Sequence, residues 1–277
     1  MPDKASYLTM LKYGLIHPHA AFELYMENKR LKINRKHPFK FSEEIRVFEN
    51  YQNFLKCLID YDEPSKIYST SLNNTYFNLI EEIESVYGKD KSISVLSLDE
   101  SISLYFLIKN LKPEIVVETG VSDGMSSFII LSALNENGKG KLYSIDLADV
   151  GMPKLYGKEP GWIVDEELRK RWTLIYGKTS DELPELLEKL KYVDIFLHDS
   201  EHSYENMQFE FSLALKYMKE GSLLLSDDAR ANSAFEELRN IEGLNQNRMC
   251  FLIGRNSDLG ALMLNCANKS LAGRQST

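Results

Sequence analysis

The chain has 277 residues, with 41 acidic and 33 basic side chains and a formal net charge of −8 at pH 7. This negative charge argues against general nucleic-acid binding, which depends on neutralising phosphates. The apolar content of 43% is typical of a globular protein, and no apolar run reaches the roughly 18 residues of a membrane helix. Because no secretory signal is apparent, we expect a cytoplasmic protein, and we expect it to form a homo-oligomer.

The three cysteines Cys57, Cys250 and Cys266 are scattered and form no C-x-x-C pair. An odd number at such spacing argues against both a disulfide framework and a zinc cluster. Cys250 and Cys266 lie in or beside apolar runs, so we expect buried, unreactive thiols there.

Residues 1–110 predict a mostly helical extension. Apolar residues at helical spacing indicate helices at 7–16, 22–26, 39–61, 76–87 and 98–111, with Gly88 capping the fourth. His17 and His19 flank Pro18 without a carboxylate or cysteine nearby, so they indicate a helix boundary better than a metal site.

A basic stretch interrupts the extension at residues 29–40, where six lysines and arginines occur without an acid. A solvated loop is the simpler interpretation. The alternative is a docking segment for a phosphorylated substrate or for weak contact with an anionic surface, to which each basic residue contributes about 1 kcal/mol.

Residues 111–266 alternate between apolar strands and amphipathic helices. The expected strands are 115–118, 141–146, 173–176, 193–197, 221–226, 249–253 and 261–264, and the expected helices are 125–134, 166–171, 181–190, 204–218 and one through Phe235 and Leu238. This alternation predicts an α/β domain with a mostly parallel sheet covered on both faces. Because only residues 254–260 separate the last two strands, they should form an antiparallel hairpin. Residues 267–277 are polar and are expected to be frayed.

The first strand ends in a glycine turn of the kind that lets a backbone approach a ligand. Glu118, Gly120 and Gly124 mark this turn, but Ser122 and Met125 stand where the dinucleotide fingerprint needs glycines. The turn resembles motif I of the class I S-adenosylmethionine-dependent methyltransferases, from which Ser122 departs. That resemblance implies S-adenosylmethionine as the cofactor.

Acidic or polar residues follow every core strand, where parallel sheets bind ligands. Asp146, 26 positions after Gly120, suits hydrogen bonding to a ribose diol. Gly177-Lys178-Thr179 resembles the tail of a phosphate-binding loop, but Trp172 stands where that motif needs glycine. We therefore expect Thr179 and Ser180 to cap the next helix, with a second role for Thr179 beside the nucleobase. The full set expected around the cofactor is Glu118, Thr119, Gly120, Ser122, Gly124, Ser126, Asp146, Thr179 and Asp199.

Asp199, Asp227 and Asp228 follow two strands that should be neighbours. Clustered carboxylates repel one another unless a cation or a proton neutralises them, and oxygen ligands favour Mg²⁺ or a similar divalent cation. His202 would stand over the same crevice, and its usual pKa of about 6.5 suits a general base. Helix capping by Asp199, a solvated Asp228 and a surface His202 are the structural alternatives. His198 is interpreted as structural.

Asp199-Ser-Glu-His202-Ser-Tyr-Glu and the strand ending in Asp227-Asp228 are similar to the metal-dependent O-methyltransferases that act on sugars and related small molecules. The resemblance covers residues 110–265 and implies a seven-stranded sheet of order 3-2-1-4-5-7-6. It also implies that the three aspartates hold Mg²⁺, that His202 is the catalytic base, and that the acceptor is a small molecule or sugar. A nicotinamide-dependent oxidoreductase and a non-catalytic nucleotide-binding protein are the alternatives.

Overall fold

The computed structural model describes residues 28–41, 45–62, 66–88, 95–147, 158–241 and 248–264. The expected helices before residue 28, with His17 and His19, lie outside these ranges. So do residues 148–157 of the long loop after the second predicted strand, Cys266 and the 267–277 tail. No helix in the described ranges is long and apolar enough to cross a membrane.

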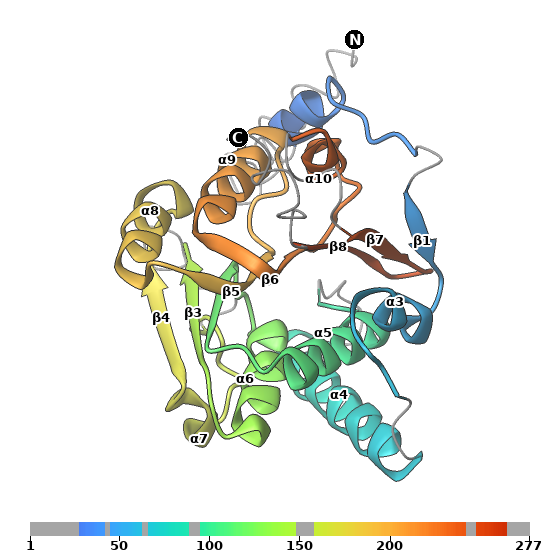
Figure 1. The fold of residues 1–277 in the computed structure, drawn as a ribbon. Helices are drawn as coiled ribbons and strands as arrows, with labels where there is room; N and C mark the ends of the chain where they lie inside the picture. The colour runs from blue at the N-terminus through green and yellow to red at the C-terminus, as the bar shows by residue number, and fades with distance from the viewer. Residues whose placement is uncertain are drawn as a thin grey trace, which may run out of the picture.

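An eight-stranded sheet forms the centre of the molecule, in the order β1-β7-β8-β6-β5-β2-β3-β4 (Figure 1). Its strands are β1 Arg46–Phe48, β2 Ile115–Thr119, β3 Lys141–Asp146, β4 Trp172–Tyr176, β5 Val193–His198, β6 Met218–Ser226, β7 Arg248–Ile253 and β8 Asp258–Met263. Only β8 runs antiparallel to its neighbours β6 and β7. Without β1, the order read from β4 is the predicted 3-2-1-4-5-7-6, so the predicted fold class is confirmed.

The eighth strand was not predicted, and the expected helix over residues 39–61 is wrong in its first half. Residues 46–48 pair in parallel with β7 at the edge of the sheet. The helix α3 begins only at Tyr51 and ends at Leu58, with the Asn50 side chain accepting from the Asn53 amide. Edge pairing thus outweighs helical spacing before residue 50, and the Asn50 cap sets where the helix starts.

Helices cover both faces of the sheet (Figure 1). One face carries α3 with α4 Lys66–Tyr87, α5 Leu98–Leu111 and α6 Met125–Asn137. The other carries α8 Thr179–Leu190, α9 Tyr204–Ala214 and α10 Ala234–Glu237, and the short elements are α7 Glu166–Arg169, η2 Leu215–Tyr217 and η3 Leu238–Asn240. Apolar side chains from each layer pack on the sheet as two clusters, one per face.

Local sequence accounts for the elements that lead to the site. The helix α5 has its predicted bounds, because Ser97 and Glu100 form a capping box at its start. Val116 and Val117 in β2 are both fully buried, as expected for a strand covered on both faces. The extension also reaches this strand's end, where the Tyr87 hydroxyl of α4 donates to Asp123.

Candidate active site

The turn after β2 requires glycine for reasons of space as well as conformation. Gly120 has φ +84°, and a Cβ there would lie 1.9 Å from the carbonyl oxygen of Asp199. Gly124 begins α6 with φ +101°, where a Cβ would lie 2.6 Å from the Cα of Gly161. The backbones of β2, β5 and the 158–165 segment therefore meet closely at this edge of the sheet.

Glu118 lies under the turn and is fully buried. Its Oε2 accepts hydrogen bonds of 2.6 Å from both Ser127 and Ser144, whereas its Oε1 has no partner among the described residues. Burial raises the pKa of Glu118, although serine hydroxyls including that of Ser126 oppose the shift. An unpartnered buried acceptor of this kind suits a ligand that brings hydrogen-bond donors.

Asp146 ends β3 beside the same turn. Its Oδ2 accepts from the backbone amides of Val121 at 2.8 Å and Ser122 at 3.1 Å. Ser122 is exposed and has φ +51°, which explains how a residue other than glycine closes this turn. Asp146 therefore fixes the turn as well as ending the strand.

Thr119 and Thr179 were also predicted to lie at the cofactor, but their hydroxyls contact other protein side chains. Thr119 is fully buried, and its hydroxyl donates to Glu210 at 2.6 Å. Thr179 is the first residue of α8, whose cap is Lys178, so the predicted capping role of Thr179 and Ser180 is wrong. The Thr179 hydroxyl instead lies 3.4 Å from the side chain of Asn206.

The predicted acids converge where β5 and β6 end. Ligand atoms of Asp199, His202 and Asp227 all lie within 4.8 Å of one another. Burial and the charge of Asp227 raise the pKa of Asp199 well above its usual value. Burial, with the charges of Glu100 and Asp228, raises the pKa of Asp227 to about 7. The cluster is therefore electrostatically unsatisfied.

His202 is only 8% exposed, so it is not the surface histidine that the structural alternative supposed. Its Nε2 lies 3.9 Å from Asp227 Oδ2, and its Nδ1 lies 3.6 Å from Asp228 Oδ2. Burial and the neighbouring charges of His198 and Arg30 lower the pKa of His202 to about 3, so the imidazole is neutral. Asp228 is more exposed than the other acids and lies outside the group of three.

A second set of polar groups, on helix α9, contacts the loop that follows β5. Glu210 is fully buried in α9, with His198 Nδ1 2.7 Å from its Oε2. Its Oε1 accepts from Ser200 at 2.7 Å and from Asn206 at 3.0 Å. Asn206 also donates to the carbonyl of Glu201. These contacts hold in place residues 198–201, which include Asp199 and lead directly to His202.

The basic stretch also reaches this loop. Residues 28–34 are helical and lie beside α9 and α10 (Figure 1). Asn34 is buried, donates to the carbonyl of His202 at 2.9 Å and accepts from the Tyr204 amide at 3.0 Å. Asn232 donates to the same His202 carbonyl at 3.2 Å. The backbone of His202 is thus fixed from two sides.

Sequence reasoning did not identify Glu210, Asn206 or Asn34. A signal existed for the first two, since they are polar residues four apart on a helix face that also contains Met207 and Phe211. Asn34 offered no signal, because 168 positions separate it from His202.

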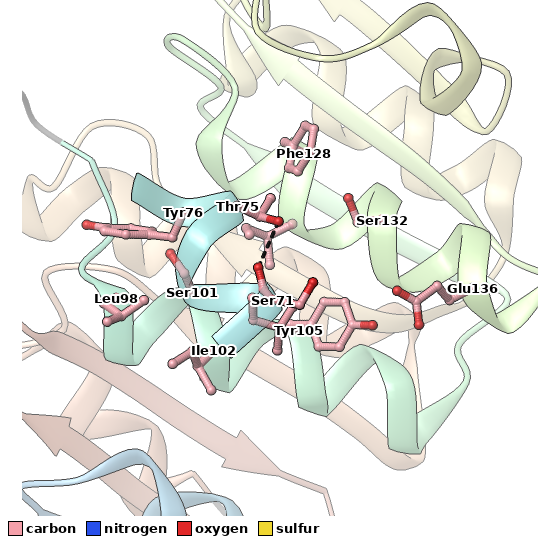
Figure 2. Close-up of a pocket in the computed structure, with 12 residues that line it drawn as sticks. Ser71, Thr75, Tyr76, Leu98, Ser101, Ile102, Tyr105, Phe128, Ser132 and Glu136 are labelled. Carbon is pink, nitrogen blue, oxygen red and sulfur yellow. Dashed lines mark hydrogen bonds between the residues drawn. The ribbon is translucent and has the colours of Figure 1, made fainter. Parts of the chain in front are cut away.

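A pocket of about 220 Å³ lies elsewhere, between α4, α5 and α6. Figure 2 shows its mixed lining of apolar and hydroxyl side chains, among them Tyr76, Ser101, Tyr105 and Phe128. None of the predicted site residues lines it. It is therefore separate from the cluster of Asp199, His202 and Asp227 at the ends of β5 and β6.

Comparison with known families agrees with this arrangement. Residues 117–229, from β2 past the Asp227-Asp228 pair, match the model of a family described as a methyltransferase domain. The matched residues form a methyltransferase domain. The predicted resemblance is thereby confirmed, and the match spans the glycine turn, Asp146, Asp199 and His202.

Solved structures show the same fold. Cofactor-bound Rv0187 from MTB is 15% identical, covers 76% of this chain and 94% of its own, and gives a TM-score of 0.51. The SAH-bound Podospora anserina methyltransferase PaMTH1 is 12% identical, and the match covers 75% of this chain and 100% of that protein with a TM-score of 0.50. At these identities the likeness concerns the fold alone. No curated protein matches the sequence.

Proposed function

We propose that this methyltransferase transfers a methyl group to a hydroxyl of a small molecule or sugar, with the assistance of a divalent cation. The observation that carries the proposal is the convergence of Asp199, His202 and Asp227 within 4.8 Å, beside the glycine turn. Such a cluster is costly when unneutralised and suits an acceptor whose oxygen must lose a proton.

The cofactor fits the residues around the turn. The unpartnered Glu118 Oε1 offers an acceptor to the methionine part, and Gly120 and Gly124 let the turn pack closely against Asp199 and Gly161. Asp146 would hold the ribose while its Oδ2 keeps the Val121 and Ser122 amides in position. The Thr119 hydroxyl already donates to Glu210, so Thr119 would contact the cofactor through its backbone.

Asp199 and Asp227 would hold the cation, with the more exposed Asp228 beside His202. Their raised pKa values fit a cation site, because a cation replaces the protons that otherwise relieve their repulsion. Once bound, the cation would lower the pKa of the acceptor hydroxyl, and S-adenosylmethionine would supply the methyl group.

His202 would accept the hydroxyl proton while the acceptor oxygen attacks the methyl carbon and the sulfonium sulfur takes the electrons of the broken bond. Its lowered pKa keeps it neutral throughout the neutral range, but a pKa of about 3 also makes the imidazole a weaker base than its usual value of about 6.5 would. Proton transfer to His202 therefore depends on the cation, which would acidify the acceptor hydroxyl. Asn34 and Asn232 hold the His202 backbone, and Glu210 holds the preceding loop through Ser200. Positioning of this kind contributes up to about 7–11 kcal/mol in favourable reactions.

Transfer of label from S-adenosylmethionine to fractionated cell metabolites tests the proposal. Methylation of a hydroxyl should stop in excess chelator and return with Mg²⁺ or Mn²⁺, while calorimetry shows unchanged cofactor binding. Full transfer in chelator would remove the cation from the mechanism.

The His202→Ala variant separates a base from a metal ligand. As a base, His202 should leave cation and cofactor affinity intact while its loss slows transfer by about 10²–10⁴-fold. Loss of Mn²⁺ affinity in this variant would instead make His202 a ligand.

A different reaction is less well supported. The nicotinamide oxidoreductase alternative lacks two fingerprint glycines, at Ser122 and Met125, and residues 117–229 match a methyltransferase model. A non-catalytic binding protein would show cofactor binding without transfer to any metabolite fraction.

A further inference from the structure

The helix α3 lies against the strands β1 and β7 at one edge of the sheet, and two of the three cysteines meet there (Figure 1). Cys57 is on α3 and Cys250 is on β7, and both side chains pack in the same apolar cluster. Their sulfur atoms are in hydrogen-bond contact, and both cysteines are free. Neither belongs to the cluster of Asp199, His202 and Asp227, so the pair is a separate feature of the fold.

The two cysteines differ in their access to solvent. Cys57 is half-buried, whereas Cys250 is fully buried, as its position in an apolar run predicted. A small reagent that arrives from solvent therefore meets Cys57 first. Cys250 is protected from the same reagent but remains in contact with the Cys57 sulfur.

Two arginines lie beside Cys57. Nη1 of Arg46 in β1 donates to Cys57 Sγ at 3.7 Å, and Nη1 of Arg248 in β7 donates to the Cys57 carbonyl at 3.2 Å. Arg46 is directly opposite Cys250 in the pairing of β1 with β7, so this edge pairing brings the guanidinium to the cysteine pair. A thiol next to a guanidinium is more easily deprotonated, and the thiolate is the reactive form.

The surroundings of the two sulfur atoms separate their ionisation. The hydrogen bond from Cys250 and the hydrogen bond and charge of Arg46 lower the pKa of Cys57 to about 6, although burial opposes this shift. Burial raises the pKa of Cys250 well above its usual value, so Cys250 stays a thiol and donates its proton to the hydrogen bond. One sulfur is thus a nucleophile and its neighbour a protonated thiol.

We propose that Cys57 is a site of reversible oxidation by hydrogen peroxide, and that Cys250 converts the oxidised Cys57 into an intramolecular disulfide. The Cys57 thiolate attacks one peroxide oxygen and the O–O bond breaks, which leaves a sulfenic acid on Cys57 and a hydroxide that takes up a proton as water. The Cys250 sulfur then attacks the Cys57 sulfur, the S–O bond breaks, and the hydroxyl leaves with the Cys250 proton as a second water. Two thiols lose two electrons in total, and one peroxide accepts them.

The positions of the two residues suit this second step. Sulfur atoms that already share a hydrogen bond need only a short approach to reach the bond length of about 2.05 Å. The product would join α3 to β7 and would leave the residues of the candidate active site unchanged. The inference therefore does not depend on the methyl-transfer reaction.

Mass spectrometry of the full chain under native conditions tests the proposal. Hydrogen peroxide should remove the mass of two hydrogens, and a non-reducing digest should contain Cys57 and Cys250 in one linked peptide. Dithiothreitol should restore the starting mass. A link to Cys266, a link between two chains, or oxidation of Cys57 to sulfinic acid without any disulfide would overturn the proposal, as would the absence of oxidation at Cys57.

The Cys250→Ala variant separates the two steps. Without the second thiol, the sulfenic acid on Cys57 should persist, so dimedone should label Cys57 in this variant far more than in the native protein. Equal labelling of the two proteins would show that Cys250 does not resolve the oxidised form.

A surface variant keeps the test decisive if the buried Cys250→Ala substitution unfolds the protein. Arg46→Gln changes an exposed residue and leaves both cysteines in place, so peroxide should form the disulfide several-fold more slowly at pH 7. The matched control is Lys56→Gln, which removes the same charge from the exposed residue next to Cys57 and should leave the rate unchanged. Equal rates in Arg46→Gln and Lys56→Gln would overturn the activation of Cys57 by Arg46.

Discussion

Two carboxylate sites lie on either side of the loop after β5, and the protein treats them in opposite ways. Burial alone would raise the pKa of Glu210, but the charge and hydrogen bond of His198, with donors from Thr119 and Ser200, lower it to about 2. Asp227 has no comparable set of donors, and burial with the charges of Glu100 and Asp228 raises its pKa to about 7.

The difference separates a structural support, Glu210, from a candidate binding site, Asp227 with Asp199. Glu210 is ionised and fully hydrogen-bonded within the protein, so it needs no ligand and holds the loop rigid. Asp227, with Asp199, is held where only a proton or an outside cation can relieve its charge. Buried acids of the same chemistry can thus be assigned different roles from the partners that the fold provides.

Replacing Glu210 should have the largest effect on the stability of the protein. Glu210→Gln places an amide among groups that all donate and leaves His198 without its charge partner, so we expect the free energy of unfolding to fall by about 3 kcal/mol or more. Urea titration measures this fall in the free energy of unfolding. Glu205→Gln, at an exposed position in the first turn of the same helix, should cost less than about 1 kcal/mol. Equal losses in the two variants would contradict the assigned support role.

The candidate binding site should respond to pH in the opposite sense to a carboxylate that the protein fully hydrogen-bonds. Because folding raises the pKa of Asp227 from about 3.9 to about 7, the folded state holds its proton more tightly. This stabilising contribution is present below about pH 4 and is lost as the pH rises to about 7. In chelator, the Tm difference between the native protein and Asp227→Asn should therefore shift in favour of Asn across that window.

Adding Mn²⁺ to the same Tm measurement tests whether a cation binds at Asp227. A cation binds the deprotonated acids, so it should raise the Tm of the native protein more at pH 8 than at pH 5, and should have little effect on Asp227→Asn. A Tm increase that is independent of pH would place the cation elsewhere.

Much of the fold could be predicted because its core elements are locally consistent. The predicted bounds of 98–111 and 141–146 agree with α5 and β3, since a capping box and an apolar strand with an acidic end define them in sequence. The strand β1 could not be predicted in the same way. It has three residues and pairs only with β7, whose sequence lies about 200 positions later, so local spacing favoured a helix there.

The residues of the candidate site show the same difference between features set by local sequence and features set by tertiary packing. Asp146, Asp199 and Asp227 were predictable because the carboxyl ends of parallel strands meet at one edge, whichever helices cover the sheet. Glu210 and Asn34 act from the middle of a helix and from the distant extension, and only tertiary packing brings them to His198 and His202. Sequence therefore predicted the acids at the strand ends better than the residues that support them.

Asp146 combines features of both carboxylate sites and should show the smallest effect of the three. One of its oxygens supports the turn by accepting from Val121 and Ser122, and its position at the end of β3 suits a ribose diol. Loss of a charged hydrogen bond costs about 1.5–3 kcal/mol, so Asp146→Ala should weaken S-adenosylmethionine binding by about tenfold or more in calorimetry. Asp146→Asn keeps an acceptor for the two amides and should therefore bind more tightly than Asp146→Ala. Unchanged affinity in both variants, with the turn intact, would exclude Asp146 from the cofactor site and leave it a support like Glu210.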